Sequence, residues 1–489
     1  HPTMSSAFST TTAAIVQLSS SGALGSMLNQ LKSREVDTFQ SVFFITRAHA
    51  VGSERSSHEE DIHSGKRANI RGKLEVTRSF DLITHAYLVV DLPGICSAAT
   101  ADNTQVTAMT GAADSPFYTN HVANALIRKA HLSMGGHAVA SLTGVQQVVH
   151  EELAGKSGKR LTAMVGAAAG GDIADLKRRS SRAQRLYVPL NFFFSASRFG
   201  PSAALSIISN QFQKICVDLE LNSLVSVIEN HGADSAVQGA ISTVAAKKTF
   251  VCDPVSTAPQ SEPIRDGSPV SVNNLVELSS SYNGGARCTL DVTGITLNES
   301  DRTAMAVKDR LILIAETFQH SFEGTNAIAS NTLTSLDLTE SMKNLLFEIQ
   351  IAARAHEDGA GNARGPMAFD GELDASNGLV SGPLTTIDLR ISGQQRTTAD
   401  LEADFYNMIT PYQSHSLLPS MTGVYSLPFA MYPEELLVSS SANVSKLDSL
   451  TLRFRTATLQ GANKVDVHVI GHAYNILVQS KGMSARYFV

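Results

Sequence analysis

The sequence predicts an all-β protein built from two tandem copies of one β-sandwich or jelly-roll unit. A short apolar and aromatic run broken by one proline occurs at residues 186–194 and again at residues 424–431. Before each run, a segment alternates apolar and polar residues and then reaches a glycine, at residues 125–136 and 384–394. Because both pairs follow the same order at similar spacing, they indicate a duplicated domain and not a solenoid. Such a duplication suggests a building block before it suggests an enzyme.

Length and composition agree with two large β-domains. The chain has 489 residues, and single all-β domains often reach roughly 200–250 residues. Charged residues make up 17% of the sequence, below the ~25% typical of soluble domains. The net charge is -6, and the basic clusters are short: residues 156–160, residues 177–179 and Arg182. Proteins that bind nucleic acid usually have a basic face or tail, so we interpret these clusters as solvated loops and expect no direct nucleic-acid contact.

The cysteines indicate neither a metal site nor a disulfide framework. Cys96, Cys216, Cys252 and Cys288 include no CxxC pair, so zinc binding is not expected. Free thiols fit a reducing compartment. The first residues lack a basic segment followed by an apolar core, so no secretory signal is expected. No apolar run reaches the ~18 residues of a membrane-spanning helix.

The first half of the chain is expected to contain an arm, several strands and two loops. Residues 1–27 are rich in Ser, Thr and Ala, and their scattered apolar residues predict an arm that is ordered only against a partner: Ile15, Val16, Leu18, Leu24 and Met27. Alternating or apolar runs predict strands at residues 39–46, 71–78, 86–92, 125–134, 186–194 and 204–221. Gly, Ser and basic residues predict a long loop at residues 154–184. The Pro- and Gly-containing residues 222–284 predict a functional loop insertion, since structureless runs of this length are uncommon.

A helix is predicted between the two units. Asn298 follows a strand-like segment as a candidate N-cap, with acidic residues behind it that suit a helix through Lys308. We therefore expect the first jelly roll at residues 28–298 and the second at residues 299–489. The second unit should hold strands at residues 311–318, 450–456 and 465–478. It should also hold a loop insertion at residues 356–382. Both insertions are expected to face outward, either for host attachment or glycan display or as a passive surface.

Several short motifs resemble functional sites, but each lacks part of its pattern. The acidic and histidine residues at 58–63 could chelate a metal, yet such a run beside Ser and Gly is more often an exposed loop. His150, Glu151 and Glu152 lack the second histidine of a zinc-protease helix. The glycines at 166–171 and the segment 155–157 lack the spacing of a phosphate-binding loop. We therefore expect no catalytic, cofactor-binding or metal-binding residues.

The sequence also contains one acidic pair and two glycosylation sequons. Glu434 and Glu435 would support glycosidase chemistry only if they faced each other across a cleft, and adjacent residues of a strand or turn point apart. Asn298 and Asn443 begin Asn-x-Ser sequons. Without a secretory signal, both asparagines are expected to stay unglycosylated by the host secretory route.

Segments in both halves, taken in order, match the pattern of a known family. In the first half they are residues 65–66, 78–83, 87–93, 118–120, 125–127, 135–136, 143–144, 188–194 and 210–212. In the second half they are residues 343–347, 393–396, 433–435, 440, 443–448, 473–477 and 482–483. Together they resemble the double jelly-roll major capsid proteins of nucleocytoplasmic large DNA viruses. The chain resembles a divergent member, because Phe80 replaces a usual glycine, Phe193 a common tryptophan and Lys446 a usual arginine.

The resemblance implies a fold and an assembly. The fold is two tandem eight-stranded jelly rolls with a short linker helix and long loop insertions. The assembly is a homotrimeric, pseudo-hexameric capsomer that tiles an icosahedral shell over an inner membrane, with minor capsid and penton proteins and neighbouring capsomers as partners. The implied location is the virion capsid shell, assembled in the host cytoplasm, and the loops could meet a host surface receptor. The arm at residues 1–27 is then expected on the inner side of the capsomer.

A second class of function stays open. A jelly roll can also be a soluble carbohydrate-binding protein or a hydrolase, since one fold hosts many functions. Duplication without an acid pair, a metal set or a nucleophile favours the structural protein. Size in solution discriminates between the two, because a capsid protein should run as a trimer and a lectin or hydrolase need not.

Overall fold

Antiparallel strands build the first half of the chain into two facing sheets. Sheet 1A has the order β1 (Phe44–Ala50), β17 (Arg287–Thr296), β4 (Leu82–Leu92), β10 (Gln184–Pro189), and β11 (Leu205–Ser206) also pairs with β4. Sheet 1B has the order β2 (Ser57–Glu59), β3 (Asn69–Glu75), β12 (Ile215–Leu221), β8 (Ile127–Met134), β9 (His137–Leu142). Alternate residues of the two sheets, such as Leu88 and Val90 of β4 and Val217 and Leu219 of β12, join one buried cluster.

The second half forms an equivalent pair of sheets. Sheet 2A has the order β18 (Arg310–Asn326), β26 (Lys464–Ser480), β20 (Ser341–Ile351), β23 (Val424–Pro428), with β24 (Ala442–Asn443) on β20 and β27 (Met483–Arg486) on β26. Sheet 2B has the order β19 (Asn331–Leu333), β25 (Leu450–Thr456), β21 (Leu384–Ile391), β22 (Gln394–Gln395). Its core includes Tyr425, Leu452 and Phe454.

This computed structural model describes only part of the chain. The described residues are 44–50, 57–59, 69–76, 78, 81–97, 105–107, 117–155, 161–168, 173–195, 204–222, 224–229, 249–253, 269–271, 276–277, 287–296, 299–307, 309–326, 331–333, 341–351, 367, 384–392, 394–395, 402–435, 438–446, 450–456 and 464–487. The expected arm at residues 1–27, the candidate cap Asn298 and all of the 356–382 insertion except Met367 lie outside them. The expected boundaries of the two units therefore stay predictions.

The predicted duplication is confirmed by the strand order of the two halves. Strands β1-β17-β4-β10 correspond to β18-β26-β20-β23, and β3-β12-β8-β9 correspond to β19-β25-β21-β22. Both sequence repeats therefore lie on equivalent strands, β10 with β23 and β8 with β21. The proline that ends each of the strands β10 and β23 is followed by the same hydrogen bond: Leu190 N–H donates to Ala86 O at 2.9 Å, and Phe429 N–H donates to Lys343 O at 2.9 Å. The chain is an all-β double jelly roll.

The long loop predicted at residues 154–184 is wrong for residues 162–165 and 173–180, which are helical, and another helix ends at residue 154. Helix α4 (Gly144–Ala154) begins at Thr143, whose side chain accepts a hydrogen bond from Gln146 N–H, and it buries Val148, Val149 and Leu153. Helices α5 (Thr162–Val165) and α6 (Ile173–Ser180) follow. Glycine and serine suggested a loop, but tertiary burial of one apolar side stabilises a helix despite weak local propensity.

Two further expectations need correction. The strand predicted at residues 204–221 is interrupted by a 3-10 helix, η3 (Ile208–Asn210), and the strand predicted from residue 125 begins at Ile127 because helix α3 (Val122–Leu126) precedes it. The 222–284 insertion is not structureless, since its described residues include four short strands: β13 (Ile228–Glu229), β14 (Thr249–Asp253), β15 (Pro269–Ser271) and β16 (Val276–Glu277). Three of them pair with strands of the 94–118 region: β5 (Gly94–Ser97), β6 (Gln105–Thr107) and β7 (Phe117–Tyr118).

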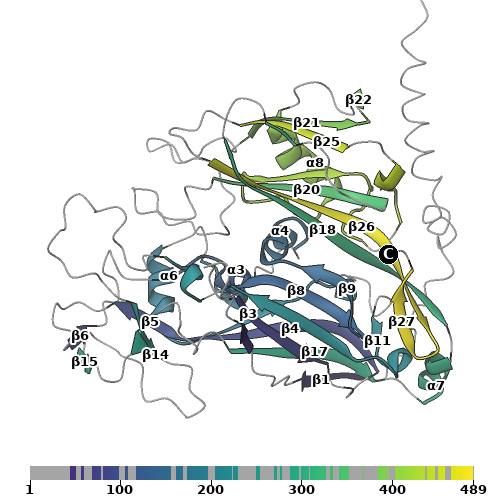
Figure 1. Cartoon of the computed structure of the whole chain (residues 1–489), viewed down its shortest axis with the longest axis horizontal. Helices are drawn as coiled ribbons and strands as arrows, with labels where there is room; N and C mark the ends of the chain where they lie inside the picture. Colours follow the sequence, from purple (N-terminus) through teal and green to yellow (C-terminus); the bar gives the residue numbers. More distant parts are fainter. Residues whose placement is uncertain are drawn as a thin grey trace, which may run out of the picture.

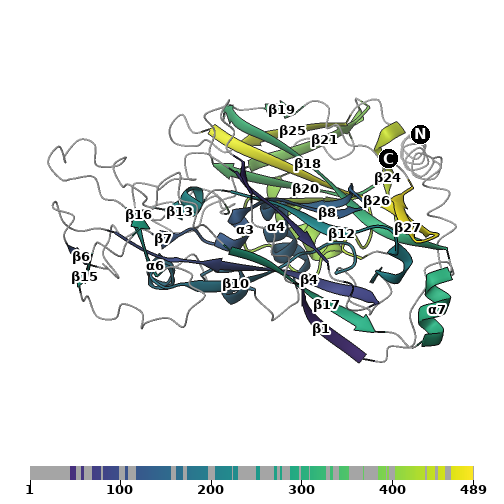
Figure 2. The same cartoon turned by 60° about the horizontal axis from the view of Figure 1, so that its bottom comes forward.

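The helix expected between the two units is confirmed as α7 (Glu299–Val307). It lies at one edge of the molecule, between β17 and β18 in sequence (Figures 1 and 2). The short strands β5, β6, β14 and β15 lie at the opposite edge.

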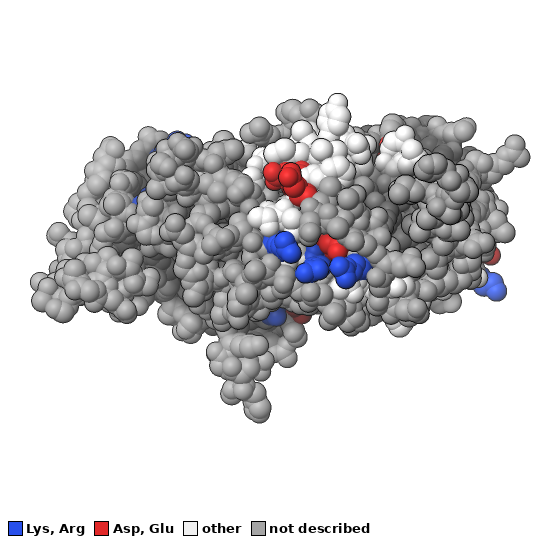
Figure 3. All heavy atoms as spheres, turned by 90° about the horizontal axis from the view of Figure 1, so that it is seen from above, with Lys and Arg blue, Asp and Glu red and all other residues white. Residues whose placement is uncertain are grey.

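The two sandwiches stack in one direction. Figure 1 shows, from top to bottom, sheet 2B, sheet 2A, helix α4, sheet 1B and sheet 1A. One buried cluster crosses the junction and includes Val149 of α4 with Ile314, Leu346 and Ile470 of sheet 2A. Beyond sheet 2B, the described part of the outer face carries basic and acidic side chains close together (Figure 3). In β21 of that sheet, Arg390 Nε lies 3.1 Å from Asp388 Oδ2.

Candidate functional site at the junction of the two jelly rolls

A cavity of about 80 Å³ lies where the two jelly rolls meet. Its walls come from β9 and α4 of the first unit and from β18, β20 and β26 of the second. Most of its lining area is apolar, but five titratable side chains also reach it: His150, Lys343, His415, Glu434 and His472. Of this group, only Glu434 and His150 stand in motifs of the sequence that resemble functional sites; Lys343, His415 and His472 do not.

Lys343 occupies the most unusual position in the cavity wall. It stands in the apolar strand β20, where the register against β26 shifts between Met342 and Asn344, so Lys343 is the extra residue of a bulge. The residue is 5% exposed, and its Nζ lies 5.7 Å from the ring centroid of Tyr474. Burial lowers the pKa of Lys343 to about 8, although nearby Glu434 opposes the shift.

His415 and Glu434 form a hydrogen-bonded pair beside Lys343. His415 Nδ1 lies 3.2 Å from Glu434 Oε1, and its Nε2 lies 2.7 Å from Ser426 Oγ. Glu434 also accepts hydrogen bonds from the N–H of Ser416 at 2.7 Å and from the Ser416 hydroxyl. Burial tends to raise the pKa of Glu434, but the hydrogen bonds from His415 and Ser416 outweigh it and the pKa lies below its usual value. Both carboxylate oxygens of Glu434 thus have partners within the protein, which does not suit the glycosidase acid pair with Glu435 considered above.

His472 belongs to a chain of contacts that links the two units. Gln146 Nε2 of α4 donates to Thr317 Oγ1 of β18 at 3.0 Å, and Thr317 Oγ1 lies 3.3 Å from His472 Nδ1. Burial holds the pKa of His472 well below 6.5, and the nearby Lys343, His150 and His415 add to this effect.

The depressed pKa of His472 predicts acid sensitivity. Folded His472 stays neutral while the unfolded chain takes up a proton near pH 6.5, so stability falls as the pH drops below about 6.5. Relative to a His472→Gln variant, we expect the wild type to lose up to ~1.4 kcal/mol per pH unit in this window. Urea denaturation at several pH values measures the difference. A His137→Gln control at an exposed site should follow the wild type, and parallel wild-type and His472→Gln curves would disprove the prediction.

The acidic residues of α4 make structural contacts. Glu151 Oε1 accepts a hydrogen bond from Leu161 N–H at 3.1 Å, and burial raises the pKa of Glu151 to about 7. Glu152 Oε2 accepts from Ser420 N–H at 2.6 Å and from Ser420 Oγ at 2.7 Å, which joins α4 to the second unit. Within the described ranges, no group of three His, Cys, Asp or Glu residues could hold a metal ion.

The remaining sequence motifs lie partly outside the described residues. Of the 58–63 cluster, only His58 and Glu59 lie in a described strand, and their side chains are not described. Gly166, with φ of +75°, ends helix α5, and residues 169–171 are outside the description. Cys216 and Cys288 are free thiols, and the side chains of Cys96 and Cys252 are not described. The second sequon is buried at Asn443, which accepts a hydrogen bond from Ser445 Oγ at 2.6 Å.

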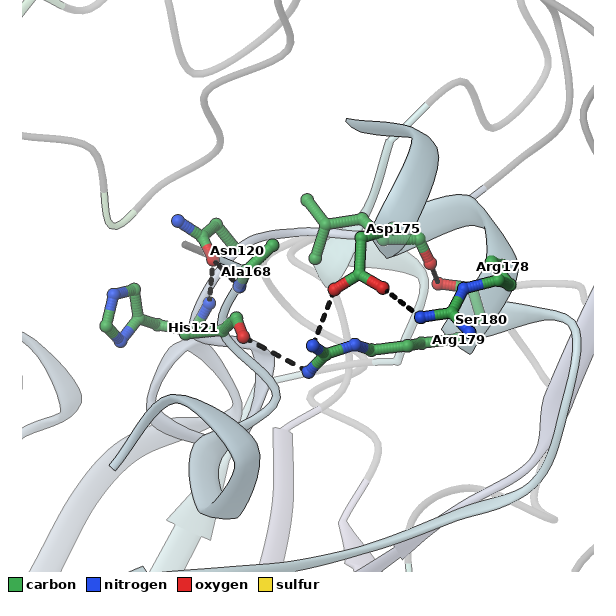
Figure 4. Close-up of polar contacts among 9 residues, drawn as sticks. Asn120, His121, Ala168, Asp175, Arg178, Arg179 and Ser180 are labelled. Carbon is green, nitrogen blue, oxygen red and sulfur yellow. Dashed lines mark hydrogen bonds and ion pairs between the residues drawn. The ribbon is translucent and has the colours of Figure 1, made fainter. Parts of the chain in front are cut away.

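The basic residues of α6 contact other side chains and the backbone of the protein. The solvated loop expected at residues 177–179 is therefore wrong. Asp175 lies 2.5 Å from guanidinium nitrogens of both Arg178 and Arg179 (Figure 4). Arg179 also donates to Ala167 O at 3.2 Å. Lys177 Nζ lies 5.5 Å from the ring centroid of Phe117. These contacts give the cluster a structural role at the end of sheet 1A.

No helix in the described part of the chain is long and apolar enough to cross a membrane.

Family models match both halves of the chain. Residues 49–254 match a family described as "Major capsid protein N-terminus". Residues 301–485 match a family described as "Large eukaryotic DNA virus major capsid protein". These families consist of structural proteins and not of enzymes, which removes the hydrolase alternative.

Two curated relatives agree with the family matches. The chain is 34% identical over 103 residues to the major capsid protein of Phaeocystis pouchetii virus and 35% identical over 103 residues to that of Chrysochromulina ericina virus. Each alignment covers 21% of this chain and only 19% and 17% of the two relatives.

Two solved structures share the fold. The chain of the PBCV-1 virus capsid superposes with a TM-score of 0.61 at 16% identity, covering 93% of this chain and 99% of that one. The Faustovirus major capsid protein superposes with a TM-score of 0.61 at 9% identity, covering 94% of each chain. The family predicted from the sequence is confirmed, and with it the virion capsid as the location. This chain belongs to the major capsid proteins of large eukaryotic DNA viruses.

Proposed function

We propose that this chain assembles as a homotrimeric, pseudo-hexameric capsomer that tiles an icosahedral shell over an inner membrane. The observation that carries the proposal is the stacking of two jelly rolls of the same topology, in which sheet 1B with α4 meets sheet 2A. Three copies supply six such units, and a cyclic ring is built from heterologous contacts of this kind.

The outer sheets supply the two surfaces that a ring needs. Stacking leaves sheet 1A and sheet 2B at opposite ends of the chain (Figure 1). In a closed ring, sheet 2B of one subunit meets sheet 1A of the next and repeats the junction found within the chain. The segment of π-helix η7 (Phe405–Ile409) and α8 (Thr410–Ser414) lies between β22 and β23, as α4 lies between β9 and β10.

The η7–α8 segment also exposes apolar side chains. Met408, Ile409 and Tyr412 are 56%, 45% and 78% exposed, and Leu418 just beyond is 54% exposed. Residues 408 and 412 lie one helical turn apart and share a face. Exposed apolar side chains on one short segment suit a protein contact, and we assign Met408, Ile409 and Tyr412 to the neighbouring subunit.

Native mass spectrometry tests the trimer and the contact. We expect the wild type at three times the 52.1 kDa chain mass. The double variant Met408→Asp/Tyr412→Asp should shift toward monomer, because charges then replace apolar side chains in the interface. Val307→Asp is the matched control, since Val307 is 81% exposed on α7, away from this segment. A wild type that stays monomeric at micromolar concentration would count against the trimer, whereas a trimeric double variant would count only against the assigned contact.

Neighbouring capsomers, minor capsid and penton proteins and a host surface receptor are the proposed partners. Residues 28–298 and 299–489 are the proposed units, with α7 at the start of the second. The insertions at residues 222–284 and 356–382 are proposed to face outward, and the arm at residues 1–27 to face inward.

A further inference from the structure

The cavity between the two jelly rolls contains a buried ammonium group without a hydrogen-bond acceptor. Lys343 is 5% exposed and lines the cavity. The charge of Glu434 acts on it, but its Nζ lies over the ring of Tyr474 and makes no hydrogen bond or ion pair with a described residue. An ammonium group has three donors, and leaving them unsatisfied away from bulk water is costly. The cavity therefore has to contain something that accepts hydrogen bonds from Lys343.

A second unsatisfied donor reaches the same cavity from the other jelly roll. Gln147 of α4 is 4% exposed, and its Oε1 accepts a hydrogen bond from Asn191 Nδ2 at 2.7 Å. In this orientation of the two amides, Gln147 Nε2 is buried and has no hydrogen-bond partner among the described residues. Gln147 and Lys343 both line the cavity, so two buried donors from different units converge on it.

The nearby acceptors are largely engaged elsewhere. Glu434 is the one carboxylate in the cavity lining that the structure describes, and its oxygens accept hydrogen bonds from Ser416 and contact His415. Asn344 Oδ1 is a buried acceptor without a partner, but rotation of this amide by a half-turn would present its NH2 group to the cavity. His150, His415 and His472 add imidazole side chains to the lining, and the N–H of a neutral imidazole is a further donor.

We infer that this cavity binds a small monovalent inorganic anion, of the size of a halide, held between Lys343 of the second jelly roll and Gln147 of the first. The volume of about 80 Å³ is large enough for such an ion together with several waters, since ~10–15 Å³ of cavity volume is enough to hold one water. The bound anion neutralises Lys343 and bridges the two units, and so stabilises their junction. The lowered pKa of Lys343 agrees with a site that lacks a direct carboxylate partner. The inference does not depend on trimer formation, because the site lies within one chain.

Bromide, whose anomalous scattering identifies it, is the direct probe. Crystals of the full chain soaked in sodium bromide should show an anomalous peak within hydrogen-bonding distance of Lys343 Nζ and Gln147 Nε2. Bromide peaks on the surface without one in this cavity would overturn the inference and would indicate that water alone satisfies the two donors.

Thermal unfolding in solution gives an independent readout. At constant ionic strength, exchanging gluconate, which is too large for the cavity, for chloride should raise the unfolding temperature of the wild type by roughly 2–4 °C. Lys343→Met keeps the length of the side chain and should abolish this rise. Lys73→Met is the matched control, because Lys73 is a half-exposed lysine that pairs with Asp218 at 3.8 Å, and it should keep the rise. An equal chloride effect in Lys343→Met and the wild type would overturn the inference, and if Lys343→Met fails to fold, the bromide soak of the wild type decides.

Discussion

Replacing Tyr425 by alanine is expected to destabilise the second jelly roll by about 3–5 kcal/mol. Tyr425 is fully buried in β23, and its hydroxyl accepts a hydrogen bond from Leu384 N–H of β21 at 3.3 Å. The ring therefore fills the space between sheets 2A and 2B, and its removal leaves a cavity that the two sheets cannot close without moving. The midpoint of guanidinium unfolding, followed by circular dichroism, measures the loss.

The repeat provides the control for this substitution. Tyr187 lies on the equivalent strand β10 but is 39% exposed. Tyr187→Ala should therefore change stability by only about 0.5 kcal/mol, as surface substitutions usually do. Equal losses of unfolding free energy in Tyr425→Ala and Tyr187→Ala would show that burial within the single chain does not decide how much each tyrosine stabilises the fold.

Gly144→Ala is expected to have an effect of similar size. A Cβ at residue 144 would lie 1.9 Å from Asn124 O and 2.7 Å from Ile127 O. Both neighbours are backbone atoms, so they cannot move aside as a flexible side chain could, and the start of α4 has to shift. We expect a loss of about 3 kcal/mol or more, at the upper end for overpacked sites. The shift should also weaken the contact between Gln146 and Thr317 across the junction.

Gly72→Ala is the matched control for this prediction. No atom of the described residues lies within 4 Å of a Cβ built at Gly72 in strand β3. Alanine there should be neutral or slightly stabilising, because it reduces the conformational freedom of the unfolded chain. Thermal unfolding of both variants measures the contrast, and a Gly144→Ala protein as stable as the wild type would mean that α4 packs less closely on α3 than the structure shows.

Strands could be predicted well because their signal is local. Alternation of apolar and polar residues directly reflects which side of a sheet is buried, and β25 (Leu450–Thr456) has the predicted bounds. The helix α7 was also predictable, from the acidic residues that follow a candidate cap. The family was predictable because its segments occur in a fixed order along both halves.

Helices α4 and α6 could not be predicted in the same way. Glycine, serine and a basic cluster surround them, and their stability comes from contacts with distant parts of the chain, such as Glu152 with Ser420. The candidate site at the junction was missed for a related reason. A lysine inside the apolar strand at residues 341–351 was the available signal, but no sequence pattern shows that a bulge turns Lys343 inward.

The sequence by itself determined that this chain is all-β, duplicated and a member of a capsid protein family, because strand periodicity and repeat order are properties of neighbouring residues. Only the tertiary structure decided that Ser426 of β23 is buried while Tyr187, at the equivalent position of β10, is exposed, and that Lys343, His472 and Gln147 converge on one cavity. The physical reason is that burial depends on how the two jelly rolls stack. Two copies with the same strand order acquire different surroundings once one face of each is covered by the other.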